Sequence, residues 1–306
     1  MAASDLCRRA ARMLHTSVYR AGGGNALILQ WSQAPTTRRN WGDALNPVLA
    51  KWLSGKRVIH SRYISKRLDD TVHMAVGSIL HTLHSPNTVV WGTGFIDSRH
   101  ELKAVPREVR AVRGPLTRRK LVDMGVACPE VYGDPALLVP FLYRPAVKKK
   151  RQLGVILNHM ERTPGIIGRF HGSGVHLIDM NAGIRRVVDE ALSCSMIASS
   201  SLHGVILADA YGIPNVWLKL SDRPVGDDFK YRDYLASAGR PSEPLQPPDH
   251  CSGRALENCI LDRFDYRQAA IDLRPMVRAC PFMTERALDR IMAGLDASGN
   301  HLLLHT

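Results

Sequence analysis

The chain has 306 residues, of which 45% are hydrophobic and 23% are charged. This composition is typical of a globular protein with a substantial core, and the length allows two α/β domains of roughly 100 to 200 residues each. No signal-peptide core or membrane-spanning apolar run is evident, so we expect a cytoplasmic protein. The first 20 residues leave two interpretations open, a frayed terminus or a basic helix lying on a lipid surface.

The charge is strongly basic, with 41 Lys and Arg against 28 Asp and Glu and a formal net charge of +13. Such an excess favours an acidic substrate, a nucleic acid or an anionic membrane surface as the partner. Only 6% of the residues are aromatic, the basic residues are scattered, and no nucleic-acid-binding module is recognised, so we expect no nucleic-acid partner. The six cysteines lack paired CxxC spacing, and we interpret them as reduced thiols.

Short apolar runs alternate with helical patterns through the first half of the chain. This alternation predicts a parallel sheet covered on both faces, in a first Rossmann-like domain over 1–143. A proline followed by four cations predicts a basic linker over 144–152. The expected strands lie at 26–31, 58–59, 74–76, 89–91 and 109–112, and the expected helices at 44–53 and 115–124.

The same alternation resumes after the linker and predicts a second Rossmann-like domain over 153–265 that faces the first across a cleft. A helical tail follows over 266–306, in which Thr284 is the expected cap of a helix. The segment 240–250 contains four prolines and is expected to be an exposed loop. Strands are expected at 153–157, 175–178, 194–198 and 215–220, and helices at 184–192 and 204–211.

One turn of the second half is a candidate ligand site. Residues 199–203 read SSSLH and connect the strand at 194–198 to the helix that follows. The first N–H groups of a helix lack internal partners and carry the positive end of its dipole, which favours an anion. Serine capping and a hydrogen-bonded histidine would explain the residues equally simply, but the carboxyl end of a parallel strand is where open α/β sheets bind ligands. We therefore favour a functional role for His203.

Three polar turns of the first half are further candidates. In NWGDALN, Asp43 is the expected helix cap, and Asp43 or Asn46 can hold a sugar hydroxyl. In WGTGF, two glycines around Thr93 let a ligand approach the main chain. In VRGPLT, Arg113 follows a strand and precedes a helix, where a guanidinium can bind a carboxylate or phosphate through two hydrogen bonds. The alternative for Arg113 is an exposed arginine in a salt bridge.

Taken in order, the motifs NWGDALN, VWGTGF, VRGPLTRRKL, YGDPALL and SSSLHGVILADAYGIPNVW closely resemble the bacterial polysaccharide pyruvyl transferases, particularly those of the succinoglycan and xanthan kind. The resemblance runs from about residue 40 to residue 234. It implies a two-domain fold like that of GT-B glycosyltransferases, with phosphoenolpyruvate as donor. The acceptor it implies is a terminal hexose on a lipid-linked oligosaccharide, which receives a cyclic pyruvate ketal while phosphate is released.

The resemblance also implies roles for individual residues. His203 takes the place of the family's histidine, and Arg113 that of an arginine beside the donor. Many members have an arginine two residues before the histidine, where this chain has Ser201, so either serine and the backbone amides of Ser200 and Ser201 suffice, or a cation such as Lys230 or Arg232 takes over. We expect His203 to be the acid/base, and Asp43, Asn46 and Thr93 to lie on the acceptor side.

Two other functions remain open at this stage. One is a GT-B glycosyltransferase that uses a nucleotide sugar, and the other is a non-catalytic nucleic-acid binder. No HExxH motif occurs and Asp227-Asp228 is an isolated acidic pair, so neither a metal site nor a resident cofactor is expected. The basic surface suits an acidic glycan, a lipid diphosphate and peripheral contact with the cytoplasmic face of the inner membrane.

Overall fold

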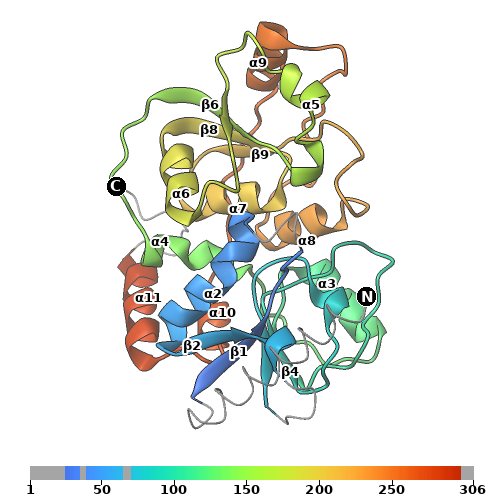
Figure 1. Ribbon diagram of the computed structural model, residues 1–306, viewed down its shortest axis with the longest axis vertical. Coiled ribbons are helices and arrows are strands. Elements are labelled where there is room, and N and C mark those ends of the chain that lie inside the picture. Colours follow the sequence, from blue (N-terminus) through green and yellow to red (C-terminus); the bar gives the residue numbers. More distant parts are fainter. Residues whose placement is uncertain (1–24, 35–38, 65–69, 298–306) are drawn as a thin grey trace, which may run out of the picture.

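The computed structural model describes residues 25–34, 39–64 and 70–297. Two parallel β-sheets with helices packed around them organise this part of the chain (Figure 1). The protein is therefore an α/β protein, as the alternation of strands and helices predicts.

The first sheet has the strand order β2-β1-β3-β4-β5, and all its neighbouring strands are parallel. The order reverses between β1 and β3, because β2 is added on one side of β1 and the later strands on the other. Its strands are β1 (Ala26–Gln30), β2 (Arg57–His60), β3 (Val72–Met74), β4 (Thr88–Trp91) and β5 (Glu108–Ala111).

The second sheet has the order β7-β6-β8-β9, also parallel, and its order reverses between β6 and β8. Each sheet thus repeats the doubly wound pattern in which consecutive strands spread outward from a central pair. The strands are β6 (Arg151–Ile156), β7 (His176–Ile178), β8 (Cys194–Ser199) and β9 (Asn215–Trp217).

The helices connect the strands and cover the sheets. The longer helices are α2 (Trp41–Ser54), α3 (Pro115–Asp123), α6 (Ile184–Leu192), α7 (Leu202–Ala210), α8 (Phe229–Ser237), α9 (Gly253–Asp262) and α11 (Glu285–Ala297). Shorter elements are α4 (Val139–Leu142), α5 (Pro164–Gly168), α10 (Arg274–Arg278) and the 3₁₀ turns η1 (Ser61–Tyr63), η2 (Leu80–Thr82), η3 (Pro135–Leu138) and η4 (His159–Glu161).

Helix α7 is buried on nearly all sides and lies between the two sheets (Figure 1). Its sequence, LHGVILADA, is apolar around the whole circumference, as is typical of a central helix rather than a surface helix. It packs against β8 and β9 and also against η3 from the first half. The largest apolar cluster of the described chain accordingly runs through both halves, from Leu29 and Trp41 to Ile156 and Ile197.

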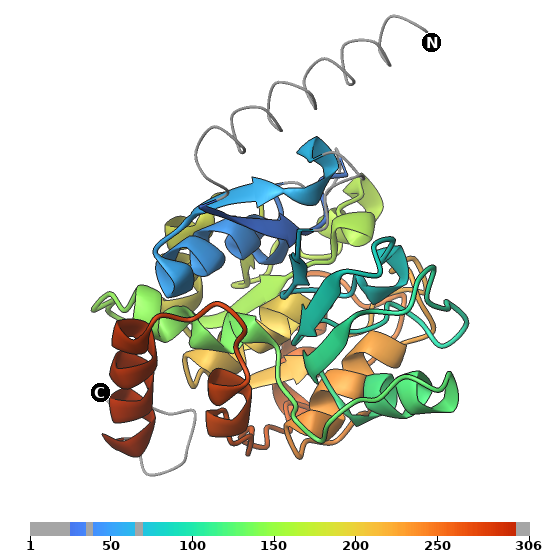
Figure 2. The ribbon, with the colours of Figure 1, turned by 90° about the horizontal axis from the view of Figure 1, so that it is seen from below.

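The C-terminal segment returns to the first sheet. Figures 1 and 2 show α11 in red beside α2, and the two helices are in contact. The Thr284 N–H donates to the Leu53 carbonyl at 2.9 Å, and Trp91 Nε1–H donates to the Met276 carbonyl at 2.8 Å. Thr284 Oγ1 accepts from the Ala287 N–H at 3.3 Å, so the predicted cap of α11 is confirmed.

Three local predictions need correction. Asp43 does not cap α2: the helix begins two residues earlier, and Asn40 Oδ1 accepts from the Gly42 N–H. The end of the predicted linker belongs to β6, which begins at Arg151. The segment 240–250 is not simply exposed, because Arg240 and Leu245 are buried and Leu245 pairs with Leu218 beside β9.

Within the described ranges, no helix is both long enough and apolar enough to cross a lipid bilayer. The five described cysteines are free, and Cys7 lies outside the described residues, as does the predicted N-terminal basic helix.

Candidate active site

A cavity of about 150 Å³ lies at the carboxyl ends of strands from both sheets. Its lining residues follow β1, β3 and β4 of the first sheet and β6 and β8 of the second, with one residue from α8. Both points at which the strand order reverses therefore open onto it, and such points are where open α/β sheets bind ligands. The cavity is lined by Ser32, Asn40, Asp43, Ser78, Ile79, Ile96, Asn158, His159, Ser201, Leu202, His203 and Lys230.

His203 projects from the first turn of α7 against glycine backbone of the first half. A Cβ added to Gly42 would lie 2.1 Å from His203 Nδ1, and one added to Gly77 would lie 3.9 Å from its Cε1. His203 Nε2 is buried and has no hydrogen-bond partner among the described residues. Leaving a buried polar atom unpaired costs about 1–3 kcal/mol, so a ligand that bonds this nitrogen recovers that cost. No hydrogen bond of Nε2 within the described residues supports the structural interpretation of His203.

The electrostatic environment favours a neutral imidazole beside a cation. The pKa of His203 is lowered to about 4, chiefly by burial and to a smaller extent by the charges of Arg113 and Lys230. Burial also lowers the pKa of Lys230 to about 8, with Arg113 contributing. At neutral pH, therefore, the imidazole is uncharged and the ammonium is largely charged. Because an anion in the cavity stabilises both protonated forms, its binding raises both pKa values.

Lys230 is the cation of the cavity wall. It is carried by α8, is 8% exposed, and donates from Nζ to the Val225 carbonyl at 2.8 Å. An ammonium has three N–H donors, so two remain for a ligand after this bond. The sequence-based alternative in which Lys230 supplies the charge absent at Ser201 is compatible with this position.

Arg113 lies behind the cavity rather than in its wall. It is fully buried and forms a salt bridge with Asp233 of α8, with Nε and one terminal nitrogen at 3.0 and 2.9 Å from the same carboxylate oxygen. Its other terminal nitrogen donates to Ser78 Oγ at 2.5 Å, and Ser78 does line the cavity. The Asp233 carboxylate also accepts from the backbone and hydroxyl of Thr117. Arg113 thus joins the first half to α8 and reaches the cavity through Ser78.

The backbone amides predicted to hold an anion already have partners. The Ser200 N–H donates to the Ile156 carbonyl at 2.9 Å, and the Ser201 N–H donates to Ser199 Oγ at 3.1 Å. Ser201 lines the cavity and is the N-cap residue of α7, but its side chain makes no capping hydrogen bond. Ser200 does not line the cavity, and its Oγ accepts from the Asn158 N–H at 3.0 Å.

The three predicted acceptor residues differ in position. Asp43 lines the cavity from the first turn of α2. Asn46 is buried, and its amide bonds both the N–H and the carbonyl of Val76, which attaches α2 to the end of β3. Thr93 is also buried, and its hydroxyl donates to the Gly77 carbonyl at 2.7 Å. Asn46 and Thr93 therefore support the cavity wall from behind.

Sequence reasoning missed two turns that line the cavity. Asn158 and His159 follow β6, and Ser78 follows β3, so each stands after a strand at which its sheet reverses. Open α/β sheets bind ligands at the carboxyl ends of their strands, and this rule, which pointed to the serine turn, points equally to these two turns. His159 is close enough to Lys230 for the lysine to lower its pKa, although burial is the larger cause.

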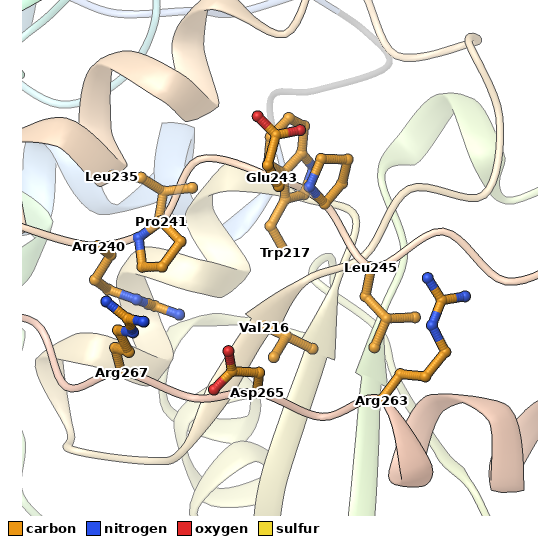
Figure 3. A pocket seen from close by; sticks show the side chains of 11 residues that line it. Val216, Trp217, Leu235, Arg240, Pro241, Glu243, Leu245, Arg263, Asp265 and Arg267 are labelled. Atoms are coloured by element: carbon orange, nitrogen blue, oxygen red, sulfur yellow. The ribbon is translucent and has the colours of Figure 1, made fainter.

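A separate cavity of about 210 Å³ lies beside β9 and is closed by the segment 240–267 (Figure 3). None of the predicted site residues lines it. Its most buried cation, Arg240, donates to both oxygens of Asp209 and to the side chain and carbonyl of Asn215. That arginine is held by these interior partners, so we take the His203 cavity as the candidate active site.

The fold and the His203 cavity define an α/β protein with a neutral histidine and a lysine in one cavity at the carboxyl ends of its strands. Residues 40–222 match the family described as polysaccharide pyruvyl transferase. This match covers more than half of the chain and contains the cavity residues from both sheets except Ser32 and Lys230. The chain belongs to this family and is a transferase enzyme, and its class of reaction is pyruvyl transfer in polysaccharide synthesis.

Two curated proteins are similar to this chain, and the name of one of them refers to polysaccharide synthesis. The chain is 29% identical over 228 residues to the succinoglycan biosynthesis protein ExoV of Rhizobium meliloti, covering 71% of this chain and 67% of that protein. It is 28% identical over 211 residues to an uncharacterized protein of Acanthamoeba polyphaga mimivirus, covering 65% of this chain and 71% of that protein. No solved structure matches the chain.

Proposed function

We propose that this enzyme transfers the pyruvyl group of phosphoenolpyruvate to a terminal hexose of an exopolysaccharide repeat unit, forming a cyclic ketal and releasing phosphate. The observation that carries the proposal is the unpaired, buried Nε2 of His203 in a cavity that also contains Lys230. An imidazole that exchanges protons and a cation that attracts a phosphorylated acid are the two groups this reaction needs.

The donor anion is bound by Lys230, with Ser201 and Asn158 as hydrogen-bonding neighbours in the same wall. Arg113 supports the site from behind Ser78, and its charge adds to the positive potential that Lys230 and His203 experience. This arrangement keeps Ser200 as a structural residue. It supplies the positive charge by a lysine on α8 instead of an arginine at position 201.

The reaction forms two C–O bonds to the central carbon of the enolpyruvyl group and breaks its bond to the phosphate oxygen. Two sugar hydroxyls lose their protons, one of which reaches the methylene carbon to make a methyl group, while the other leaves with phosphate. Neutral His203 accepts a hydroxyl proton and, once protonated beside the bound anion, delivers it. General acid–base catalysis of this kind contributes typically 10²- to 10⁴-fold to the rate.

The hexose enters from the side of Asp43, whose carboxylate accepts a hydrogen bond from a sugar hydroxyl. Asn46 and Thr93 contribute by fixing the backbone at Val76 and Gly77 beside that hydroxyl. No metal or cofactor takes part in this scheme, and phosphoenolpyruvate is a co-substrate.

The two halves correspond to the lobes of a GT-B-like enzyme, with an acceptor lobe over 1–143 and a donor lobe over 153–265. The described part of the C-terminal segment, residues 266–297, packs back on the first lobe through contacts such as that of Thr284 with Leu53. A lipid-linked oligosaccharide is the acceptor, which the net charge of +13 supports by favouring peripheral contact with the anionic inner face of the membrane.

The direct test is incubation of the enzyme with phosphoenolpyruvate and a panel of aryl and lipid-linked glycosides. We expect acceptor-dependent release of inorganic phosphate and a product with the mass of a pyruvate ketal. A His203→Gln variant should still bind phosphoenolpyruvate but form ketal at least 10²-fold more slowly. Glycosyl transfer from a nucleotide sugar, with phosphoenolpyruvate left intact, would overturn the proposal, and a His203→Gln variant with near wild-type turnover would remove the acid/base role.

A further inference from the structure

A larger cavity, of about 400 Å³, opens beside the His203 cavity in the first half. We name it the Trp31 cavity after the aromatic residue in its wall. The two cavities share four lining residues, Ser32, Ser78, Ile79 and Ile96. The two cavities therefore adjoin along this common wall.

Most residues that line the Trp31 cavity are polar and uncharged, while the surface they expose to it is mainly apolar. No carboxylate of the described chain lines it, and its one arginine, Arg62, donates to Gln33 Oε1 at 2.9 Å. Burial lowers the pKa of His60 to about 4 and also lowers that of His81, so both imidazoles are neutral at physiological pH. A wall of this kind does not suit a diphosphate and does suit a neutral ligand with many hydroxyl groups.

Three side chains in this wall carry a buried polar atom with no hydrogen-bond partner in the described chain. These atoms are Gln30 Oε1, Ser61 Oγ and His81 Nδ1. They belong to lining residues from three separate elements, β1, η1 and the 3₁₀ turn η2. Unpaired buried polar atoms are uncommon in native proteins, and hydroxyls, which both donate and accept, are suited to pairing with all three.

Trp31 contributes a large apolar side chain to the wall, which also includes Ile79 and Ile96. It is half-buried, directly follows β1, and its ring meets that of His60 edge to face with centroids 4.3 Å apart. His60 Nε2–H donates to the Trp31 carbonyl at 2.9 Å, which fixes the backbone that carries the indole. An aromatic body held rigidly among neutral hydrogen-bonding groups can cover the C–H face of a sugar ring.

We propose that the Trp31 cavity is the subsite for the second sugar of the acceptor, a neutral hexose unit to which the pyruvylated terminal hexose is linked. This inference rests on the proposed function, since the terminal hexose must reach the common wall at Ser32 and Ser78 for the next sugar to enter. It extends that function by making the enzyme selective for acceptors of two or more sugars.

The test compares the p-nitrophenyl glycosides of a single hexose and of the matching disaccharide. For Trp31→Ala, we expect the KM for the disaccharide to rise about tenfold, which corresponds to about 1.4 kcal/mol, while the KM for phosphoenolpyruvate and for the monosaccharide glycoside stays within about twofold. Trp31→Phe should restore most of the loss. Trp52→Ala removes the same side chain from α2 outside the cavity and is the matched control.

His84→Ala is the second variant, because His84 is exposed and lines the cavity, so its removal does not threaten folding. We expect the same selective rise in the disaccharide KM, about threefold. Calorimetric binding of the disaccharide glycoside, without phosphoenolpyruvate, should weaken in parallel in both variants.

An equal effect of Trp31→Ala on both acceptors, or no effect on disaccharide binding, would overturn the subsite. The binding measurement does not depend on turnover. A wild-type enzyme that binds the disaccharide through Trp31 but forms no ketal would therefore contradict the proposed function and leave the subsite supported.

Discussion

Replacing Gly42 by alanine should displace the imidazole of His203. The new Cβ would lie 2.1, 2.2 and 2.3 Å from the ring's Nδ1, Cε1 and Cγ, whereas real Cβ atoms essentially never approach another heavy atom closer than 3.0 Å. The ring must therefore withdraw by about 0.9 Å, because Gly42 itself is held in the first turn of α2. The substitution tests whether the position of His203 is what the activity depends on.

Two opposing free energies decide the stability of this variant. Overpacking a tight contact costs about 1–3 kcal/mol, while exchanging glycine for alanine in a helix contributes roughly 0.5–1 kcal/mol in favour of folding. We expect a net destabilisation of about 1–2 kcal/mol. Since misplacing a catalytic group by about 1 Å costs on the order of 10²-fold in rate, kcat should fall by about that factor with a smaller change in the KM for phosphoenolpyruvate.

The assay is a double-mutant cycle with His203→Ala, measured by urea denaturation. In that background the ring atoms that meet the new methyl group are absent, so Gly42→Ala should no longer destabilise the protein and should stabilise it by up to about 1 kcal/mol. Gly168→Ala, whose added Cβ meets nothing within 4 Å, serves as the control. The same destabilisation in both backgrounds would refute the reasoning, because the clash would then not involve the imidazole.

Three further predictions concern buried titratable side chains. Asp233→Ala leaves Arg113 buried without its partner and should cost about 3–5 kcal/mol in unfolding free energy, whereas Asp222→Ala, at a side chain 93% exposed, should cost less than about 1 kcal/mol. Because the pKa of Lys230 is about 8, the wild-type KM for phosphoenolpyruvate should rise above pH 8 as the ammonium is lost, and Lys230→Met should have a high KM that no longer changes there. Burial lowers the pKa of His73 from 6.5 in the unfolded chain to about 4 in the folded protein. The unfolded chain therefore binds the additional proton between these two pH values, and the folded protein loses stability as the pH falls from 6.5 to about 4. The His73→Phe variant should show a slope of unfolding free energy against pH that is smaller by up to about 1.4 kcal/mol per pH unit in this range.

The elements of this protein were largely predictable because each strand is a short buried apolar run closed by polar turn residues. The helix predicted at 184–192 is α6, with the same ends. The strand predicted at 194–198 is β8, which continues for one more residue, to Ser199. The starts of α2 and α7 were placed too late. The side chain that caps α2 is that of Asn40. Asp43 follows three positions later, and both residue types are good helix caps, so the sequence alone does not distinguish them.

The candidate site was predictable only as far as strand ends indicate it. Asp43, Ser201, His203 and Lys230 come together in one cavity, whereas Arg113, Asn46, Thr93 and Ser200 stand one layer behind it. Whether a predicted residue lines the cavity or lies behind it depends on whether its hydrogen-bonding groups are already paired with distant elements. Asp233 lies 120 residues from Arg113 along the chain, and no local pattern identifies it as the partner.

The pairing of Arg113 with Asp233 also explains how a lysine on a separate helix can serve the cavity. Helix α8 carries Asp233 and Lys230 on adjacent turns, so the bonds that Asp233 makes to Arg113 and Thr117 fix the helix against the first half and hold Lys230 in the cavity wall. A guanidinium at position 201 would be charged at every physiological pH, while the buried ammonium of Lys230 loses its proton near pH 8. The site therefore gains its positive charge from the contact between the two halves, and weakening that contact should weaken donor binding even though neither Asp233 nor Thr117 lines the cavity.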